Sequence, residues 1–120
     1  MATHNELGIW GEQVATDYLQ RKGYVIMERD WKSGHRDIDI IATKNDTVVF
    51  VEVKTRRNRV FGDPEEAIDY MKLHNLRAAI NHYVNYKHIH QEIQFDAITI
   101  VGTPEGGEPE ITHIEDFPLY

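Results

Sequence analysis

Apolar residues recur every three to four positions over the first part of the chain, a spacing that predicts an amphipathic helix. The positions with this spacing are Leu7, Trp10, Val14 and Tyr18. Thr3 and Glu6 form a capping-box pattern at its start, and Gly23 is suited to the residue after its last turn. We therefore expect a first helix from about residue 3 to residue 22.

Apolar stretches of strand length follow this helix. Residues 24–31 form the first stretch and end at the polar turn 32–35. Residues 37–54 contain two more stretches, joined by the polar turn of Lys44, Asn45 and Asp46. This pattern is typical of a β-hairpin.

The pattern returns to helical spacing in the second half. Asp63 is placed as an N-cap, Pro64 at the first helical position and Glu66 as the second half of a capping box. The apolar positions that follow, to about Asn85, are Ile68, Met71, Leu76, Ala79, Ile80 and Tyr83. This periodicity predicts a second long helix.

The chain then returns to strands. Residues 91–101 predict a strand that runs parallel to 48–53 if the helix between them is a right-handed crossover. Residues 104–109 form a turn, 110–114 a short edge strand and 117–120 a tail. The order αβββαβ with a last short strand predicts an α/β protein, with a mixed sheet flanked by helices, in a single domain over residues 1–120.

The hairpin carries charged residues among apolar ones. Strict alternation would place Asp37, Asp39 and Ile41 on one strand face, and Val48, Phe50, Glu52 and Lys54 on one face of the next strand. If these faces coincide, the two carboxylates and the ammonium converge. Burying an unpaired charged group costs on the order of several kcal/mol. A hard cation bound through the carboxylate oxygens would remove that cost. The alternative is a Glu52–Lys54 pair at a strand edge, with Asp39 capping a turn.

The first helix contains a further carboxylate. Glu12 shares a stripe with Gly8, Ala15 and Leu19, which predicts that it faces the body of the protein. Gly8 and Gly11 each weaken a helix, so we expect another element to pack closely against both. The alternative for Glu12 is an ordinary exposed helix carboxylate.

Composition limits the environment of the protein. The 120 residues contain no cysteine, which excludes disulfides and thiolate-bound zinc, and no apolar run is long enough to span a membrane. The N-terminus lacks the pattern of a signal peptide, and the default expectation is a cytoplasmic protein without membrane contact.

The net charge of −7 argues against nucleic-acid binding, but its distribution does not. Residues 1–87 are neutral, with 13 basic and 13 acidic residues, whereas residues 88–120 hold 7 acidic residues and no Lys or Arg. A basic run of Lys54, Arg56, Arg57 and Arg59 follows the hairpin, where a phosphate backbone would lie. The alternative for this run is a solvated loop.

The same residues match a known pattern. The motif that surrounds Asp39 and the Glu52-x-Lys54 tripeptide resembles the PD-(D/E)xK nuclease superfamily and, within it, the YraN-like family of small bacterial proteins, which are similar to archaeal Holliday-junction resolvases. The matching residues are Gly8, Gly11, Glu12, Ala15, Tyr18, Leu19, Gly34, Asp39, Ala42, Phe50, Glu52, Lys54, Arg56, Phe95, Asp96, His113, Ile114 and Phe117.

The resemblance implies a restriction-endonuclease-like core and a metal-dependent endonuclease that hydrolyses phosphodiester bonds in DNA, with branched DNA as a candidate substrate. It implies that Asp39 and Glu52, with the backbone carbonyl of Val53, bind Mg²⁺ or Mn²⁺, and that Glu12 reaches the ion directly or through water. Lys54 would orient or deprotonate the attacking water. Action on a symmetrical junction would require a homodimer.

The resemblance also implies that the basic run, through Arg56, Arg57 and Arg59, holds the nucleic-acid backbone without reading its sequence. The chain departs from the family pattern where a glycine is replaced by Arg36 and a glutamate by Asp37. Asp37 is shorter, so its role as a second ligand is in question, and Arg36 could alter the turn that aims the strand.

Other interpretations remain open. The histidines His74, His82, His88 and His90 could suggest a metal site, but no carboxylate or cysteine is suitably spaced around them, and packing or surface roles are favoured. Besides a nuclease, the chain could be a non-catalytic nucleic-acid-binding module or a protein-interaction domain whose acidic C-terminal third meets a basic partner.

Overall fold

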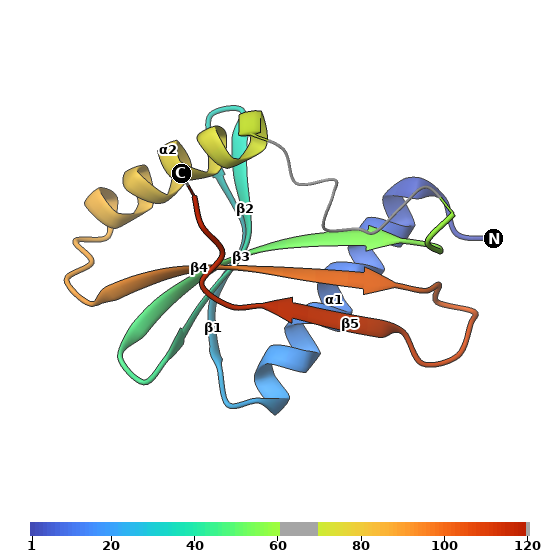
Figure 1. The fold of residues 1–120 in the computed structure, drawn as a ribbon. Helices are drawn as coiled ribbons and strands as arrows, with labels where there is room; N and C mark the ends of the chain where they lie inside the picture. Colours follow the sequence, from blue (N-terminus) through green and yellow to red (C-terminus); the bar gives the residue numbers. More distant parts are fainter. Residues whose placement is uncertain (61–69, 120) are drawn as a thin grey trace.

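The computed structural model describes residues 1–60 and 70–119 (Figure 1). It contains two long helices and five strands. In chain order they are α1 (His4–Arg21), β1 (Val25–Ser33), β2 (Arg36–Lys44), β3 (Thr47–Arg56), α2 (Tyr70–Tyr86), β4 (Glu92–Val101) and β5 (Glu110–Ile114). The order of the described elements is the one that the hydrophobic pattern predicts.

The five strands form one mixed sheet in the order β1-β2-β3-β4-β5. The pairs β1–β2, β2–β3 and β4–β5 are antiparallel, whereas β3 and β4 are parallel along ten paired positions, from Thr47 opposite Glu92 to Arg56 opposite Val101. The predicted parallel pairing after the second helix is therefore confirmed.

Each helix covers one face of this sheet and closes its own hydrophobic core (Figure 1). The core under α1 consists of Ala15, Leu19, Tyr24, Ile40, Ala42, Val49, Val51, Ile98 and Ile100. The core under α2 consists of Ile38, Ile41, Val48, Phe50, Leu76, Ala79, Ile80, Tyr83 and Phe95. The central strands are apolar on both faces because both faces are covered.

Local sequence signals explain where the first elements begin and end. Thr3 is the N-cap of α1 and forms the predicted capping box with Glu6. Gly23, which follows the helix, has a φ of +92°, a conformation that glycine adopts without cost. Asn45 and Asp46 both have positive φ values, as a two-residue hairpin turn requires.

Several predicted boundaries shift. The first strand continues to Ser33, so the turn shortens to Gly34 and His35, and β3 extends through Arg56 into the basic run. The predicted cap of the second helix at Asp63, Pro64 and Glu66 lies outside the described residues.

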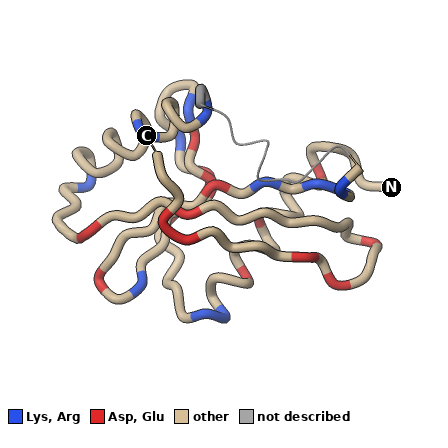
Figure 2. The backbone as a smooth tube through the Cα atoms, viewed as in Figure 1, with Lys and Arg blue, Asp and Glu red and all other residues tan. Residues whose placement is uncertain are grey.

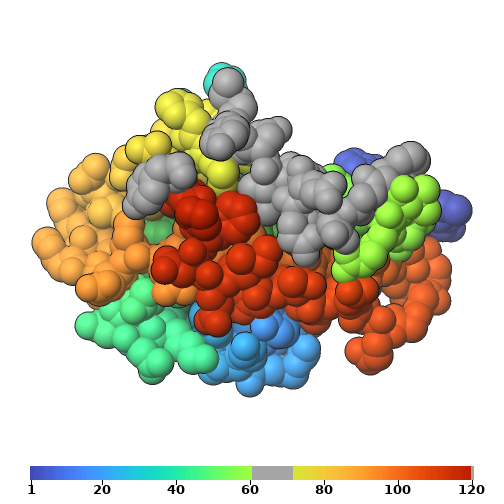
Figure 3. Space-filling view, viewed as in Figure 1, coloured from blue at the N-terminus to red at the C-terminus, as the bar shows by residue number. Residues whose placement is uncertain are grey.

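The C-terminal residues cross β4 toward α2 in Figure 1, and in Figure 3 they form a red surface next to the yellow helix. The backbone N–H of Phe117 donates to the carbonyl of Phe95 at 2.7 Å, and the two rings meet edge to face with centroids 5.9 Å apart. Phe117 and Leu119 add to the core under α2. The predicted tail is therefore part of the packed molecule as far as residue 119.

This mixed sheet between two helices is a restriction-endonuclease-like core, as the sequence predicts. Among the helices of the described residues, none combines the length and the apolar character needed to cross a lipid bilayer.

Candidate functional site

The strands β2 and β3 part at Asp39. Their register runs from Lys44 opposite Thr47 to Ile40 opposite Val51 and goes no further. At this point the carboxylate of Asp39 replaces a ladder partner, because its Oδ2 accepts a hydrogen bond of 2.8 Å from the backbone N–H of Val53. The side chain of Asp39 is thereby held at a fork in the sheet.

The fork changes the faces that strict alternation predicts. Ile40 belongs to the core under α1, whereas Ile38 and Ile41 both belong to the core under α2. Alternation therefore breaks between Ile38 and Ile40, next to Asp39, and the shared face of Asp39 and Ile41 stays a prediction. The convergence of Asp39 with Glu52 nevertheless occurs, since the two carboxyl groups are close enough to interact directly.

Glu52 is the most deeply buried of the candidate residues, with 3% of its side chain exposed. Burial raises its pKa, and the neighbouring Asp39 carboxylate raises it further. Its Oε2 atom lies 3.3 Å from the Lys72 ammonium but accepts no hydrogen bond of good geometry within the described part of the chain. The two partners are unequal, because Lys72 is 38% exposed and its charge keeps contact with water.

Glu12 approaches the fork from α1. It is half-buried, and burial raises its pKa to about 7, with Asp39 as the next largest cause. Asp39 is thus an electrostatic neighbour of both Glu12 and Glu52. Asp39 therefore links two carboxyl groups that come from different elements, Glu12 from α1 and Glu52 from β3.

The predicted Lys54 lies next to these groups. Burial lowers its pKa, and the nearby charge of Lys72 lowers it further, whereas Glu52 opposes this shift. Lys54 opens onto a hollow of about 170 Å³ at the junction of α1 and β3. The hollow is lined by His4, Leu7, Gly8, Glu12, Val53, Lys54, Thr55 and Arg56.

The two glycines of α1 have different roles. A Cβ at Gly11 would lie 1.9 Å from Oγ1 of Thr55, so close packing against β3 requires glycine there. A Cβ at Gly8 would meet nothing within 4 Å. The prediction of close packing is confirmed for Gly11 and wrong for Gly8, whose small size leaves the hollow open.

The predicted nucleic-acid residues lie at the end of β3 and just beyond it. Arg56 donates to the carbonyl of Thr55 at 3.1 Å, Arg57 donates to the carbonyl of Ala2, and Arg59 forms an ion pair of 2.6 Å with Glu110. Arg56 and Arg57 are half-buried and are therefore placed by the fold, unlike side chains of a solvated loop. Figure 2 shows the blue basic positions gathered at this end of β3.

Lys72 is the residue that sequence reasoning missed. It is four positions before Leu76, which is buried in the core under α2, so helical periodicity directs it toward the sheet. That spacing was the available signal. The contact with Glu52 could not be predicted, because the two residues are far apart in the sequence and only the fold brings them together.

The chemistry of the donor set at the fork suits a hard divalent cation, although the group of described residues with three ligand atoms within 4.8 Å of one another is Asp96, His113 and Glu115. Asp39 and Glu52 supply carboxylate oxygens on strands, and Glu12 supplies a third from the helix. Among the described residues, the buried Oε2 of Glu52 has the Lys72 ammonium at 3.3 Å but accepts no well-aligned hydrogen bond, and a metal ion would supply a further contact there. Oxygen ligands of this kind suit Mg²⁺ or Mn²⁺.

A second polar cluster lies on the α1 side of β4 and β5. Asp96 is fully buried, and its Oδ2 lies 2.7 Å from Nε2 of His113. Burial would raise the Asp96 pKa, but hydrogen bonds from His113, Gln94 and the backbone of Asp116 outweigh it and lower the pKa. Both ring nitrogens of His113 are engaged, because Nδ1 lies 3.1 Å from the hydroxyl of Tyr18.

Asp96, His113 and Glu115 could together offer three ligand atoms to a metal. The hydrogen bonds that already engage Asp96 and His113 give this cluster a structural role instead. Of the histidines singled out in the sequence, His82 contacts Oγ of Ser33 through its Nδ1 at 2.7 Å and packs edge to face on Trp31. His74, His88 and His90 are exposed.

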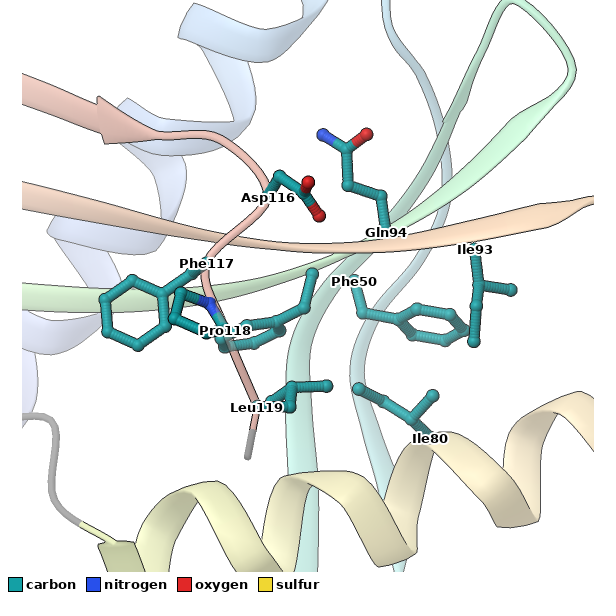
Figure 4. Close-up of a pocket in the computed structure, with 9 residues that line it drawn as sticks. Phe50, Ile80, Ile93, Gln94, Asp116, Phe117, Pro118 and Leu119 are labelled. Carbon is teal, nitrogen blue, oxygen red and sulfur yellow. The ribbon is translucent and has the colours of Figure 1, made fainter.

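A further hollow of about 130 Å³ lies between α2, β4 and the C-terminal residues (Figure 4). Its lining is mainly apolar and contains Phe50, Ile80, Ile93, Gln94, Phe95, Asp116, Phe117, Pro118 and Leu119. Asp116 is the single ionisable residue in this lining. The hollow therefore lacks the paired charges that hydrolytic chemistry requires.

Comparison with known proteins agrees over most of the chain. Residues 11–100 match the model of the uncharacterised protein family UPF0102. A UPF0102 protein of Bacteroides thetaiotaomicron is 44% identical over 97% of this chain and 94% of its own length. UPF0102 proteins of Syntrophomonas wolfei and Flavobacterium psychrophilum are 44% and 42% identical, over 92% and 97% of this chain and 96% of their own lengths.

Proposed function

The chain belongs to the uncharacterised protein family UPF0102, also described as YraN-like, and from this premise and the geometry at the fork we propose that it is a metal-dependent nuclease acting on DNA. The observation that carries the proposal is the position of Asp39. Its carboxylate is fixed by the Val53 N–H where β2 leaves β3, and it interacts with both Glu12 and Glu52.

The arrangement costs stability without a ligand. Burial, and after it the neighbouring Asp39 carboxyl group, raises the pKa values of Glu12 and Glu52, so both groups resist ionisation in the metal-free protein. A purely structural role would favour apolar residues at the position of Glu52. Raised carboxyl pKa values beside a cleft are typical of functional sites.

In this proposal Asp39 and Glu52 hold the cation, with Val53 contributing its backbone carbonyl and Glu12 completing the set. A bound Mg²⁺ or Mn²⁺ would polarise the phosphodiester and lower the pKa of a water ligand. Lys54 lies beside Glu52 with a lowered pKa, which suits it to orient the attacking water or accept its proton. Arg56, with Arg57 and Arg59, would contact the DNA backbone.

The direct test is cleavage of linear, flapped, single-stranded and four-way-junction DNAs with Mg²⁺ and with Mn²⁺. Asp39→Asn should abolish cleavage, because it removes the ligand charge while an amide oxygen can still accept the hydrogen bond from Val53. Lys54→Ala should also lose activity. Asp17→Asn is the matched control, since Asp17 is exposed on the outer side of α1.

The outcomes separate the proposal from its alternatives. Cleavage by Asp39→Asn at the wild-type rate would contradict the proposed site. Salt-sensitive binding without cleavage in either metal would favour a non-catalytic nucleic-acid-binding module. Absence of both binding and cleavage would favour a protein-interaction domain.

A branched substrate adds a requirement on assembly. A four-way junction is symmetrical, so paired cleavage needs two active sites facing each other, as in a homodimer. Sedimentation of the protein with an uncleaved junction should then show two chains per DNA. One chain per junction would contradict this version and leave cleavage of simpler DNA unaffected.

A further inference from the structure

A third hollow, of about 200 Å³, lies on the α2 side of the fork. It is lined by His35, Arg36, Asp37, Lys72, Asn75 and Leu76. One wall is the turn between β1 and β2, and the other is the first turns of α2, which lie beside that turn in Figure 1. The hollow is thus built from segments that are distant in the sequence.

The two walls are held against each other. Oγ of Ser33, the last residue of β1, contacts Nδ1 of His82 on α2 at 2.7 Å. The Trp31 ring packs edge to face on the rings of His82 and Tyr83, with centroids 5.2 and 5.1 Å apart. The hollow is therefore held in place by the packing of β1 and its turn against α2.

The lining favours an anion. Arg36 supplies a guanidinium that forms no ion pair with any described residue, and Lys72 supplies an ammonium. His35 and Asn75 add polar groups. The one carboxylate of the lining, Asp37, is balanced by Lys32, whose Nζ lies 3.1 Å from its Oδ2. Guanidinium and ammonium groups together are suited to a phosphate.

Lys72 connects this hollow to the fork. It lines the hollow, and its Nζ lies 3.3 Å from Oε2 of Glu52. The hollow that contains Lys54 and Arg56 opens on the other side, along α1. The carboxylates therefore lie between two hollows that each carry cationic side chains, an arrangement that fits one strand passing over the site.

We propose that the hollow of His35, Arg36, Lys72 and Asn75 binds a backbone phosphate of a nucleic-acid strand next to the one held at the carboxylates. This inference rests on the proposed function only in its choice of a nucleic acid as the source of the phosphate. It gives a role to Arg36, which replaces a glycine of the pattern that the chain otherwise resembles. Arg36 is the first residue of β2 and follows the turn at Gly34, and it lines the hollow together with residues of α2.

The test is binding to the metal-free protein, so that it does not depend on cleavage. We would titrate isotope-labelled protein with a thymidine hexanucleotide that lacks terminal phosphates, and separately with inorganic phosphate, and follow the backbone amide signals of His35 and Asn75. Both signals should shift with the hexanucleotide. In Arg36→Gln these shifts should be lost, and the slope of log affinity against log salt should fall by about 1.

Arg21→Gln is the matched control, because it removes the same charge from an exposed position at the end of α1. It should keep both shifts and the wild-type salt slope. Arg36→Lys should restore part of the binding, whereas Asn75→Asp should weaken it by placing a negative charge in the hollow.

Three results would overturn the inference. They are no shift at His35 and Asn75 with the hexanucleotide, equal effects of Arg36→Gln and Arg21→Gln, or shifts that occur with inorganic phosphate but not with the hexanucleotide. Failure of the proposed nuclease activity is a separate result. It would appear as absence of metal-dependent cleavage in the wild type, with hexanucleotide binding at this hollow unchanged.

Discussion

At the scale of single residues, the fork holds more negative charge than the fold requires. Glu52 lies in β3 between Val51 and Val53, with its carboxyl group removed from water. Burial is the largest cause of its raised pKa, and it outweighs the opposing charge of Lys72. The metal-free protein therefore carries a destabilising group that a ligand would relieve.

We expect Glu52→Gln to raise the free energy of unfolding of the metal-free protein by about 1–3 kcal/mol at pH 9, the size of an uncompensated buried polar group. A raised carboxyl pKa stabilises the folded state below the ordinary value of 4.5, and this contribution is lost as pH rises through the folded-state value. The advantage of the variant should therefore shrink toward pH 5. Urea denaturation in a chelator measures it, and a less stable variant at pH 9 would mean that the Lys72 pair outweighs burial.

Ionisation of Glu12 should also lower the stability of the folded protein as pH rises. Its pKa rises from 4.5 to about 7, so wild-type stability should decline between these pH values as its carboxyl ionises. Glu12→Gln should flatten that part of the stability curve. A decline of equal size in wild type and variant, measured by urea denaturation at intervals from pH 5 to 8, would assign the effect to another group.

At the scale of elements, α1 is positioned by one close approach to β3. Gly11→Ala should lower the free energy of unfolding by about 1–3 kcal/mol, because the new methyl group overlaps Thr55, whose β-branched side chain has little freedom to move. Gly8→Ala is the matched control. It meets open space and should raise stability by up to about 1 kcal/mol through helix propensity. Equal effects in chemical denaturation would contradict this packing.

The edge strand β5 depends on Asp96. Its carboxylate accepts hydrogen bonds from the Gln94 side-chain amide and the backbone N–H of Asp116, and it is hydrogen-bonded to the His113 ring. Asp96→Asn should lower stability at pH 7 by about 1.5–3 kcal/mol, the range for hydrogen bonds to a charged group. Hydrogen exchange should increase first in β5 and the following residues, and uniform exchange throughout the sheet would argue against a local anchor.

The pH dependence of this anchor has the opposite sign. The Asp96 pKa lies below its ordinary value of 3.8, so the stability it contributes is present above pH 3.8 and is lost as pH falls through the folded-state value. The difference between wild type and Asp96→Asn should therefore disappear in acid.

At the scale of the whole molecule, charge is segregated. Basic positions gather at the end of β3 and near the start of α2, while acidic ones mark the connection between β4 and β5 and the C-terminal residues (Figure 2). A net charge of −7 therefore coexists with basic positions gathered on both sides of the acidic fork. Any DNA that binds there must approach along that side, because the acidic side repels it.

We expect DNA binding in a metal chelator, where metal-dependent cleavage does not occur, to weaken steeply with salt. Arg56→Gln should reduce the slope of log affinity against log salt by about 1, the value for one lost phosphate contact. Arg21→Gln should leave the slope unchanged. Filter binding at several salt concentrations measures both, and an unchanged slope in Arg56→Gln would remove Arg56 from the interface.

The sequence by itself determined the elements. Period-2 and helical spacing, the Thr3 capping box and the turn at Asn45 and Asp46 are local signals, and the αβββαβ order follows from them. Charged residues in apolar strands indicated Asp39, Glu52 and Lys54, and a family resemblance added Glu12 from the first helix. Only the tertiary structure decided how they meet, since the break in alternation at Asp39 depends on where β2 leaves β3. Only the tertiary structure shows that Lys72 and Arg36 line the same hollow. Contacts between segments that are distant in the sequence produce no periodic pattern, so a single sequence does not predict them.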